Sequence, residues 1–160
     1  MDALVTTVLT PEDAVEVYGP AVLRTAYGLL KNMADAEDVA QEVFLNLVKT
    51  APEFESAQHQ KAWLLRCAIN RCKSHFRSAW IRRTAPLEES LAVPFSPEES
   101  TVMAAVMDLP VKYRQVIQLH YIEGYSTAEI AQILQSKQNT VISQLARGRA
   151  MLKETLKGEF

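Results

Sequence analysis

The sequence predicts an all-α protein made of two small helical domains joined by a flexible linker, the second of them a helix-turn-helix. Its 160 residues include only five glycines, and helix-favouring residues are plentiful. Apolar residues recur at helical spacing, with almost no strand-like alternation. Residues 84–96 contain two prolines and no clean period, which is typical of a linker. We therefore expect domains at residues 1–83 and 97–160.

The first helix is expected to begin at Pro11 with Thr10 as its cap, because proline is favoured at the first helical position and threonine just before it. Val15 belongs to the apolar stripe of this helix. Asn32 and Met33 are expected to break it.

A second helix is expected to start with Asp35 as its cap. Pro52 should end this helix, residues 52–57 should form a loop, and a long third helix should run from about residue 58 to residue 83. One face of the second helix carries apolar residues at spacing four, namely Val39, Val43 and Leu47.

In the second domain, Ser96 followed by Pro97 predicts the start of a helix that ends near Asp108. Pro110 opens another helix, which should stop at Gly124. Both helix starts are local signals. The first N–H groups of a helix have no partner within the helix; a capping side chain accepts a hydrogen bond from one of them, and a proline at the first position has no N–H to satisfy.

A helix-turn-helix is predicted next. Ser126 and Glu129 have the spacing of a capping box, which starts a short helix at residues 127–134. A turn at residues 135–137 leads to a final helix at about residues 138–157. The two helices can bury one shared core of Ile130, Ala131, Leu134, Val141, Leu145 and Leu152. The final helix then presents polar side chains outward, which can bond to base edges and phosphates.

Charge is unevenly distributed although the net charge is only −2. Residues 61–83 carry seven Lys or Arg and no carboxylate, so this helix forgoes every stabilising pair of opposite charges at spacing four. Such self-repulsion is relieved by a polyanion, which favours a nucleic-acid strand as partner. The first 60 residues carry ten acidic and three basic side chains, which favours a basic protein surface.

Enzymatic, metal-binding and membrane functions find no support in the sequence. It has no glycine-rich phosphate loop, no His-Glu-x-x-His and no nucleophile elbow, so we expect no enzyme and no cofactor. Cys67, Cys72 and His75 lack the spacing of zinc ligands, and the two thiols are expected to fill helix interfaces. We expect no membrane span, no secretory signal and a cytoplasmic location.

Three motifs follow one another along the chain. Residues 35–44 read DAEDVAQEVF, residues 62–70 read AWLLRCAIN, and residues 109–131 contain LP, YRQV, YIEGYS and EIA. In this order they resemble bacterial RNA polymerase sigma factors of the extracytoplasmic-function (ECF) group. The first motif is similar to the group's DAEDxxQExF signature, the second to its AWLxxIAxN stretch and the third to its DNA-binding C-terminal domain. The similarity covers nearly the whole chain and includes the linker.

The resemblance implies a role for each part. The first domain would bind core RNA polymerase through Asp35, Asp38, Gln41 and Glu42. The loop at residues 52–60 and the basic helix would recognise and open the −10 promoter element as a single strand, using Lys61, Arg66, Asn70, Arg71, Lys73, Ser74 and Arg77. The last helix would enter the major groove of the −35 duplex with Lys137, Gln138, Asn139, Thr140, Ser143, Gln144, Arg147 and Arg149. An anti-sigma protein is a further implied partner.

The last helix departs from the family pattern GxSxxTVKSRLxRAR. Gln135 stands for Gly, Lys137 for the capping Ser, Ile142 for Lys and Gln144 for Arg. Ser136 is a candidate replacement cap. Two positive charges are missing, which predicts weaker or different −35 recognition. Ile142 either meets a thymine methyl or widens the buried stripe, and we favour the buried stripe.

Two other classes of function stay open on the sequence. One is a helix-turn-helix regulator that binds duplex DNA without polymerase. The other is an interaction module that binds polymerase or an anti-sigma protein and reads promoters weakly. The leading hypothesis is a promoter-specificity subunit of RNA polymerase.

Overall fold

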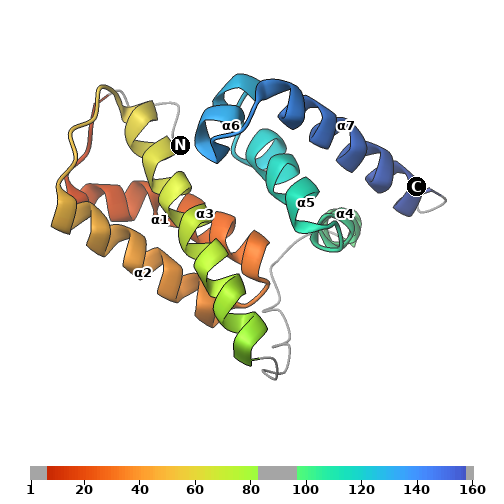
Figure 1. Ribbon diagram of the computed structural model, residues 1–160, viewed down its shortest axis with the longest axis horizontal. Coiled ribbons are helices and arrows are strands. Elements are labelled where there is room, and N and C mark those ends of the chain that lie inside the picture. Colours follow the sequence, from red (N-terminus) through yellow and green to blue (C-terminus); the bar gives the residue numbers. More distant parts are fainter. Residues whose placement is uncertain (1–6, 83–96, 158–160) are drawn as a thin grey trace. The chain divides into compact units, whose positions relative to one another are not determined.

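The computed structural model describes residues 7–82 and 97–157, and within these ranges the regular secondary structure is helical, without strands. The chain divides into two compact units, residues 1–89 and 90–160. The first unit holds α1 to α3 and the second holds α4 to α7 (Figure 1). The predicted all-α class with two helical units is confirmed. The expected linker at residues 84–96 lies outside the described residues.

Helix α1 (Pro11–Leu30) begins where the sequence predicts. Its N-cap is Thr10, whose hydroxyl accepts a hydrogen bond from the Asp13 amide at 3.3 Å. The buried face of α1 packs on both α2 and α3. Val15 is not on that face, because 47% of its surface is exposed. The prediction that Val15 belongs to the buried apolar stripe of α1 was therefore wrong. Val15 instead lines the groove described below.

Helix α2 (Met33–Thr50) begins three residues earlier than a cap at Asp35 would allow. The N-cap is Asn32, which has extended backbone and accepts a hydrogen bond from the Asp35 amide at 2.9 Å. The predicted cap was therefore wrong. Asp35 lies in the first turn of α2, where its negative charge interacts favourably with the positive end of the helix dipole. The predicted core residues Val39, Val43 and Leu47 are buried.

Helix α3 (Ala57–Arg82) follows the predicted loop and packs against both α1 and α2. Its first turn is tied to the chain that precedes α1. The Gln60 side chain accepts from the Leu9 amide at 2.8 Å and donates to the Leu9 carbonyl at 2.9 Å. The Tyr18 hydroxyl donates to the Ala57 carbonyl at 3.4 Å. These contacts fix the first half of α1 and the chain before it against the start of α3.

In the second unit, α4 (Pro97–Met107) is followed by α5 (Val111–Ile117). The buried Arg114 guanidinium closes the turn between them by donating to the carbonyls of Leu109 at 2.7 Å and Met107 at 3.3 Å. The end of α4 would otherwise leave such carbonyls without partners.

The helix opened by Pro110 was expected to run unbroken to Gly124. It instead passes from α5 into a π-helical turn, η2 (Gln118–Ile122), before Gly124 reverses the chain with φ of 80°. A π-helical turn contains one residue more than an α-helical turn. The spacing of apolar residues at three and four positions, which predicts an α-helix, does not indicate such an insertion.

The helix-turn-helix is confirmed as α6 (Thr127–Leu134) and α7 (Gln138–Thr155). The predicted capping box is present. The Glu129 amide donates to the Ser126 hydroxyl, and the Ser126 amide donates to the Glu129 carboxylate. Ile130, Val141 and Leu145 are buried between the helices. Gln135 ends α6 in the left-handed region, with φ of 53°.

The start of α7 differs from one expectation. Lys137, not the candidate Ser136, takes the N-cap position, and no side chain caps the helix there. A lysine has no acceptor, so it cannot replace the capping serine of the family pattern.

Candidate functional site

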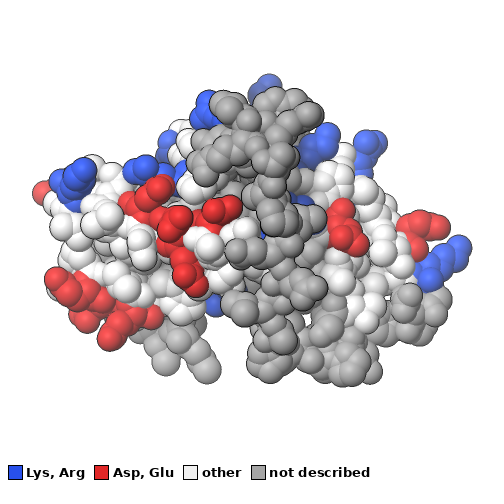
Figure 2. Space-filling model, turned by 90° about the horizontal axis from the view of Figure 1, so that it is seen from below, with Lys and Arg blue, Asp and Glu red and all other residues white. Residues whose placement is uncertain are grey.

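The acidic residues predicted to bind a partner lie on the outer surface of α2. Asp35, Asp38 and Gln41 are exposed, and Glu42 is half-buried. Figure 2 shows acidic side chains gathered over one face of the unit that holds α1 to α3. This face is suited to a basic surface.

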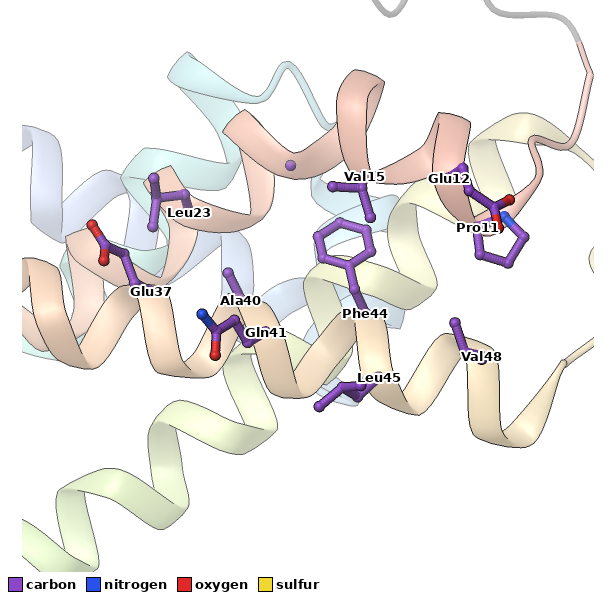
Figure 3. Close-up of a pocket in the computed structure, with 11 residues that line it drawn as sticks. Pro11, Glu12, Val15, Leu23, Glu37, Ala40, Gln41, Phe44, Leu45 and Val48 are labelled. Atoms are coloured by element: carbon purple, nitrogen blue, oxygen red, sulfur yellow. The ribbon is translucent and has the colours of Figure 1, made fainter.

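A groove with a volume of about 720 Å³ lies between α1 and α2, and Gln41 is the one residue of this set that lines it (Figure 3). The Phe44 ring points from α2 towards Val15 on α1. Leu45 is 64% exposed although it is a large aliphatic residue. The groove is lined by Pro11, Glu12, Val15, Gly19, Leu23, Glu37, Ala40, Gln41, Phe44, Leu45 and Val48.

Sequence reasoning missed this groove. The available signal was the width of the apolar pattern in α2, where Leu45 and Val48 fall outside the buried row of Val39, Val43 and Leu47. An apolar surface between two acidic side chains, Glu12 and Glu37, fits a helical partner with apolar and basic residues.

Glu42 joins the two predicted partner surfaces. Its carboxylate oxygens lie 3.7 Å from Arg71 Nη1 and 3.9 Å from His75 Nε2, both on α3. Glu42 was predicted to bind a protein and Arg71 a nucleic acid. The fold brings these two side chains together in one seam between α2 and α3.

The basic side chains of α3 are unevenly accessible. Asn70, Lys73, Ser74 and Arg77 are exposed, and Arg66 and Arg71 are half-buried. Lys61 is only 8% exposed and has an interaction within the protein. The accessible cations therefore lie from Arg66 onward. The side chain of Trp80 lies outside the described residues.

An aromatic cluster forms where the loop before α3 meets its first turns. The Phe54 ring packs edge-on against His59 at 5.3 Å and against Trp63 at 5.6 Å between centroids. The Glu55 amide donates to His59 Nδ1 at 3.2 Å, which fixes the imidazole. Trp63 is half-buried beside the loop. Sequence reasoning assigned the loop a role but missed this contact between aromatic rings, because Phe54 and Trp63 are nine residues apart and only the loop's path brings them together.

The two thiols pack as neutral groups. Burial, and then the nearby Glu42 charge, raise the pKa of the Cys72 thiol to about 12. Burial likewise raises the pKa of Cys67, whose sulfur accepts a weak hydrogen bond from Asn46 Nδ2 at 3.8 Å. Among the described residues, no group of three or more His, Cys, Asp or Glu could hold a metal ion. Within the same ranges, no helix is long and apolar enough to cross a membrane.

The outer surface of α7 is polar and basic. Gln144 is half-buried, and the other predicted side chains, Lys137, Gln138, Asn139, Thr140, Ser143, Arg147 and Arg149, are exposed. Gln138 Nε2 donates to the Thr127 hydroxyl at 2.9 Å, and Arg149 Nη1 donates to the Tyr121 hydroxyl at 3.1 Å. Ile142 is 45% exposed, so our expectation that it widens the buried stripe was wrong.

Comparison with known proteins decides the family. Residues 14–82 match the family described as Sigma-70 region 2, and residues 100–152 match Sigma-70, region 4. The ECF RNA polymerase sigma factor SigL of Mycobacterium tuberculosis is 33% identical, over 83% of this chain and 81% of the relative. SigW of Bacillus subtilis is 29% identical, over 91% of this chain and 88% of the relative.

The chain belongs to the ECF group of sigma-70 factors. Such factors direct promoter-specific initiation of transcription, and the two-unit architecture of this sigma factor follows the family, with region 2 on α1 to α3 and region 4 on α4 to α7. Solved structures show the same fold. The sigma factor RpoE of Bartonella quintana, in complex with the anti-sigma factor NepR, has a TM-score of 0.79 at 23% identity, covering 93% of this chain and 98% of that one. CnrH in complex with the cytosolic domain of CnrY has a TM-score of 0.68 at 23% identity, covering 94% and 89%.

Proposed function

We propose that this sigma factor docks on core RNA polymerase through α2 and the groove beside it. The loop before α3 and α3 itself then hold the opened −10 strand, while α7 enters the −35 major groove. The observation that carries this proposal is the combination, within one unit, of an acidic face with an apolar groove on α2 and a basic face with an aromatic cluster on α3.

For polymerase docking, the acidic face supplies attraction and the groove supplies apolar area. Asp35, Asp38 and Gln41 are exposed on α2, and Gln41 also lines the groove. Exposed charges mainly raise the association rate and set the orientation, whereas burying Leu45 and Phe44 would slow dissociation. Both features are needed for a stable complex with a basic, partly apolar helical partner.

For promoter opening, the chain must hold bases that have left the duplex, at a cost of a few kcal/mol each. Arg66, Lys73 and Arg77 can bind phosphates along the strand, and Asn70 can bond to base edges. The half-buried Phe54 and Trp63 rings offer apolar faces for an extruded base, and such stacking contributes about 1–3 kcal/mol per base. Lys61 contributes least to this proposal because it is buried.

For −35 binding, α7 presents Asn139, Ser143 and Arg147 at spacing four on its outer face. Amide, hydroxyl and guanidinium groups are those that read base edges in the major groove. Arg149 and Lys137 flank this row and can bind backbone phosphates. These exposed groups support the proposed duplex binding despite the two missing charges.

The proposal extends to location and regulation. A factor that joins polymerase and chromosomal DNA acts in the cytoplasm, needs no cofactor and catalyses no reaction of its own. The solved RpoE structure of similar fold holds the anti-sigma factor NepR, which supports an anti-sigma protein as a further partner of this chain.

A charge reversal tests the polymerase-docking role. The double variant Asp38→Lys with Glu42→Lys should lose association with core polymerase and transcription, because two attractive charges become repulsive. The matched control is Asp13→Lys with Glu16→Lys, which reverses two exposed charges on α1 that do not line the groove. Core association is measured by gel filtration with purified polymerase. Equal association of both double variants would contradict the proposal.

The same variants distinguish the alternative of a regulator that acts without polymerase. That alternative is supported by α6 and α7 alone, which form a complete helix-turn-helix. It predicts that Asp38→Lys with Glu42→Lys leaves duplex binding and regulation intact, whereas a sigma factor loses all activity that depends on polymerase.

A further inference from the structure

Ile142 is a large aliphatic side chain that is exposed on α7 and is not among the buried residues of that helix. The buried residues of α7 are Val141, Leu145 and Gly148, which face the rest of the second unit. Ile142 follows Val141 and so lies about 100° further round the helix. With 45% of its surface exposed, it contributes little to the core.

The surroundings of Ile142 are suited to DNA. Residues 138–153 contain no Asp or Glu, while Lys137, Arg147, Arg149 and Lys153 are exposed cations of α7. Exposed Asn139, Ser143 and Arg147 form a polar row at spacing four. Ile142 and Ala146 form an adjacent apolar row at the same spacing, also exposed. This surface therefore complements a nucleic acid that offers phosphates to the cations and an apolar group to Ile142.

We infer that Ile142 contacts the 5-methyl group of a thymine in the −35 major groove and thereby selects an A·T pair at that position. This inference rests on the proposed insertion of α7 into that groove. In the major groove, the thymine methyl is the one apolar group on the base edges. An isoleucine cannot bond to an amino group or a carbonyl, so any other base would lose water there without a replacement partner.

The side chain type adds precision to the contact. A β-branched residue in a helix has one strongly preferred χ1 rotamer, so the directions of the two Cγ branches of Ile142 are set before binding. A lysine at this position, as in the family pattern, would supply a mobile charge for a phosphate or for the acceptors of a guanine edge. The substitution thus exchanges a charged contact for an apolar one.

Uracil substitution tests the contact, because uracil differs from thymine only by that methyl. The −35 duplexes are first selected from a randomised library with the full-length chain bound to core polymerase. Each thymine in the selected element is then replaced by uracil in turn. At one position, the replacement should weaken binding of the wild-type holoenzyme about fourfold, the effect of removing one buried methyl.

The variant Ile142→Ala should bind the thymine and uracil duplexes equally at that position. Met151→Ala is the control, because it removes another exposed apolar side chain of α7. The Met151→Ala variant should keep the fourfold difference between thymine and uracil duplexes. Ile142→Val retains both branches at Cβ and should keep most of that difference.

Equal binding of thymine and uracil duplexes by the wild-type holoenzyme, or an undiminished difference in Ile142→Ala, would overturn the inference while leaving the proposed function standing. Loss of binding to a protein partner in Ile142→Ala, without any methyl effect on DNA, would also overturn it. Failure of the wild-type chain to select any duplex with core polymerase would overturn both.

Discussion

Arg71 Nη1 lies 3.7 Å from Glu42 Oε2, and this ion pair joins the acidic helix α2 to the basic helix α3. His75 Nε2 lies 3.9 Å from the other Glu42 oxygen. The two helices, which we propose bind different partners through opposite charges, therefore also share one internal contact.

The ion pair gives a first prediction. Because both side chains are about 40% exposed, Glu42→Gln should change the free energy of unfolding by less than about 1 kcal/mol. The exchange Glu42→Arg with Arg71→Glu keeps the pair, so urea unfolding should resemble the wild type. Promoter opening should be lost in the single variant Arg71→Glu, which keeps Glu42 for polymerase docking, since a carboxylate then faces the strand. Arg71→Lys is the control that keeps the charge. Normal opening by Arg71→Glu would show that Arg71 is structural only.

Salt dependence gives a second prediction. Promoter opening should fall steeply as salt rises, because the exposed cations of α3 displace counterions from phosphates. Lys73→Ala and Arg77→Ala should each reduce the slope of log K against log salt by about 0.7, the value for one single-strand phosphate contact. Opening is followed by fluorescence of a base analogue in the −10 strand. The control Lys49→Ala removes an exposed cation of α2 and should leave the slope unchanged. A flat salt response of the wild type would refute the assignment of α3.

The third prediction concerns the fully buried Gln60. Its side chain is 1% exposed and satisfies both the amide and the carbonyl of Leu9. Gln60→Ala should destabilise the first unit by about 1–3 kcal/mol, because backbone groups lose their partners. Gln58→Ala, which truncates an exposed neighbour, should change stability by less than about 0.5 kcal/mol. Denaturant unfolding with matched m-values measures both, and equal stability of the two variants would contradict this role.

The fourth prediction concerns the turn of the helix-turn-helix. Gln135 adopts φ of 53°, a conformation that glycine takes without steric cost. Gln135→Gly should stabilise the second unit by about 0.5–1 kcal/mol, the relief of left-handed strain less the entropy gained by the unfolded chain. Ser136→Gly, at a neighbouring residue without positive φ, should destabilise it slightly. Thermal unfolding compares the two, and a lower melting temperature for Gln135→Gly would contradict the prediction.

Local signals in the sequence predicted the elements well. The Ser126 and Glu129 capping box and the Thr10 cap depend on residues within one helical turn, so they can be read without tertiary structure. The cap of α2 failed because Asn32 and Asp35 are both competent caps three residues apart. Choosing between them requires knowing where the packing against α1 begins.

The candidate site was less predictable, since it depends on distances between elements. Residue spacing placed Lys61 with the other cations of α3, but its position near the start of that helix buries it. The Glu42 and Arg71 pair, the groove at Phe44 and the contact of Phe54 with Trp63 each join different elements, or a loop and a helix. Ile142 was misassigned because an aliphatic residue beside Val141 in a helix is usually core.

Run-off transcription tests the central claim most directly. Purified core polymerase is combined with the full chain on a library of genomic promoter fragments. The account predicts initiation at a defined subset of templates that core polymerase alone does not use, and its loss with Asp38→Lys and Glu42→Lys together. A chain that neither binds core polymerase nor starts transcription on any template would contradict the account.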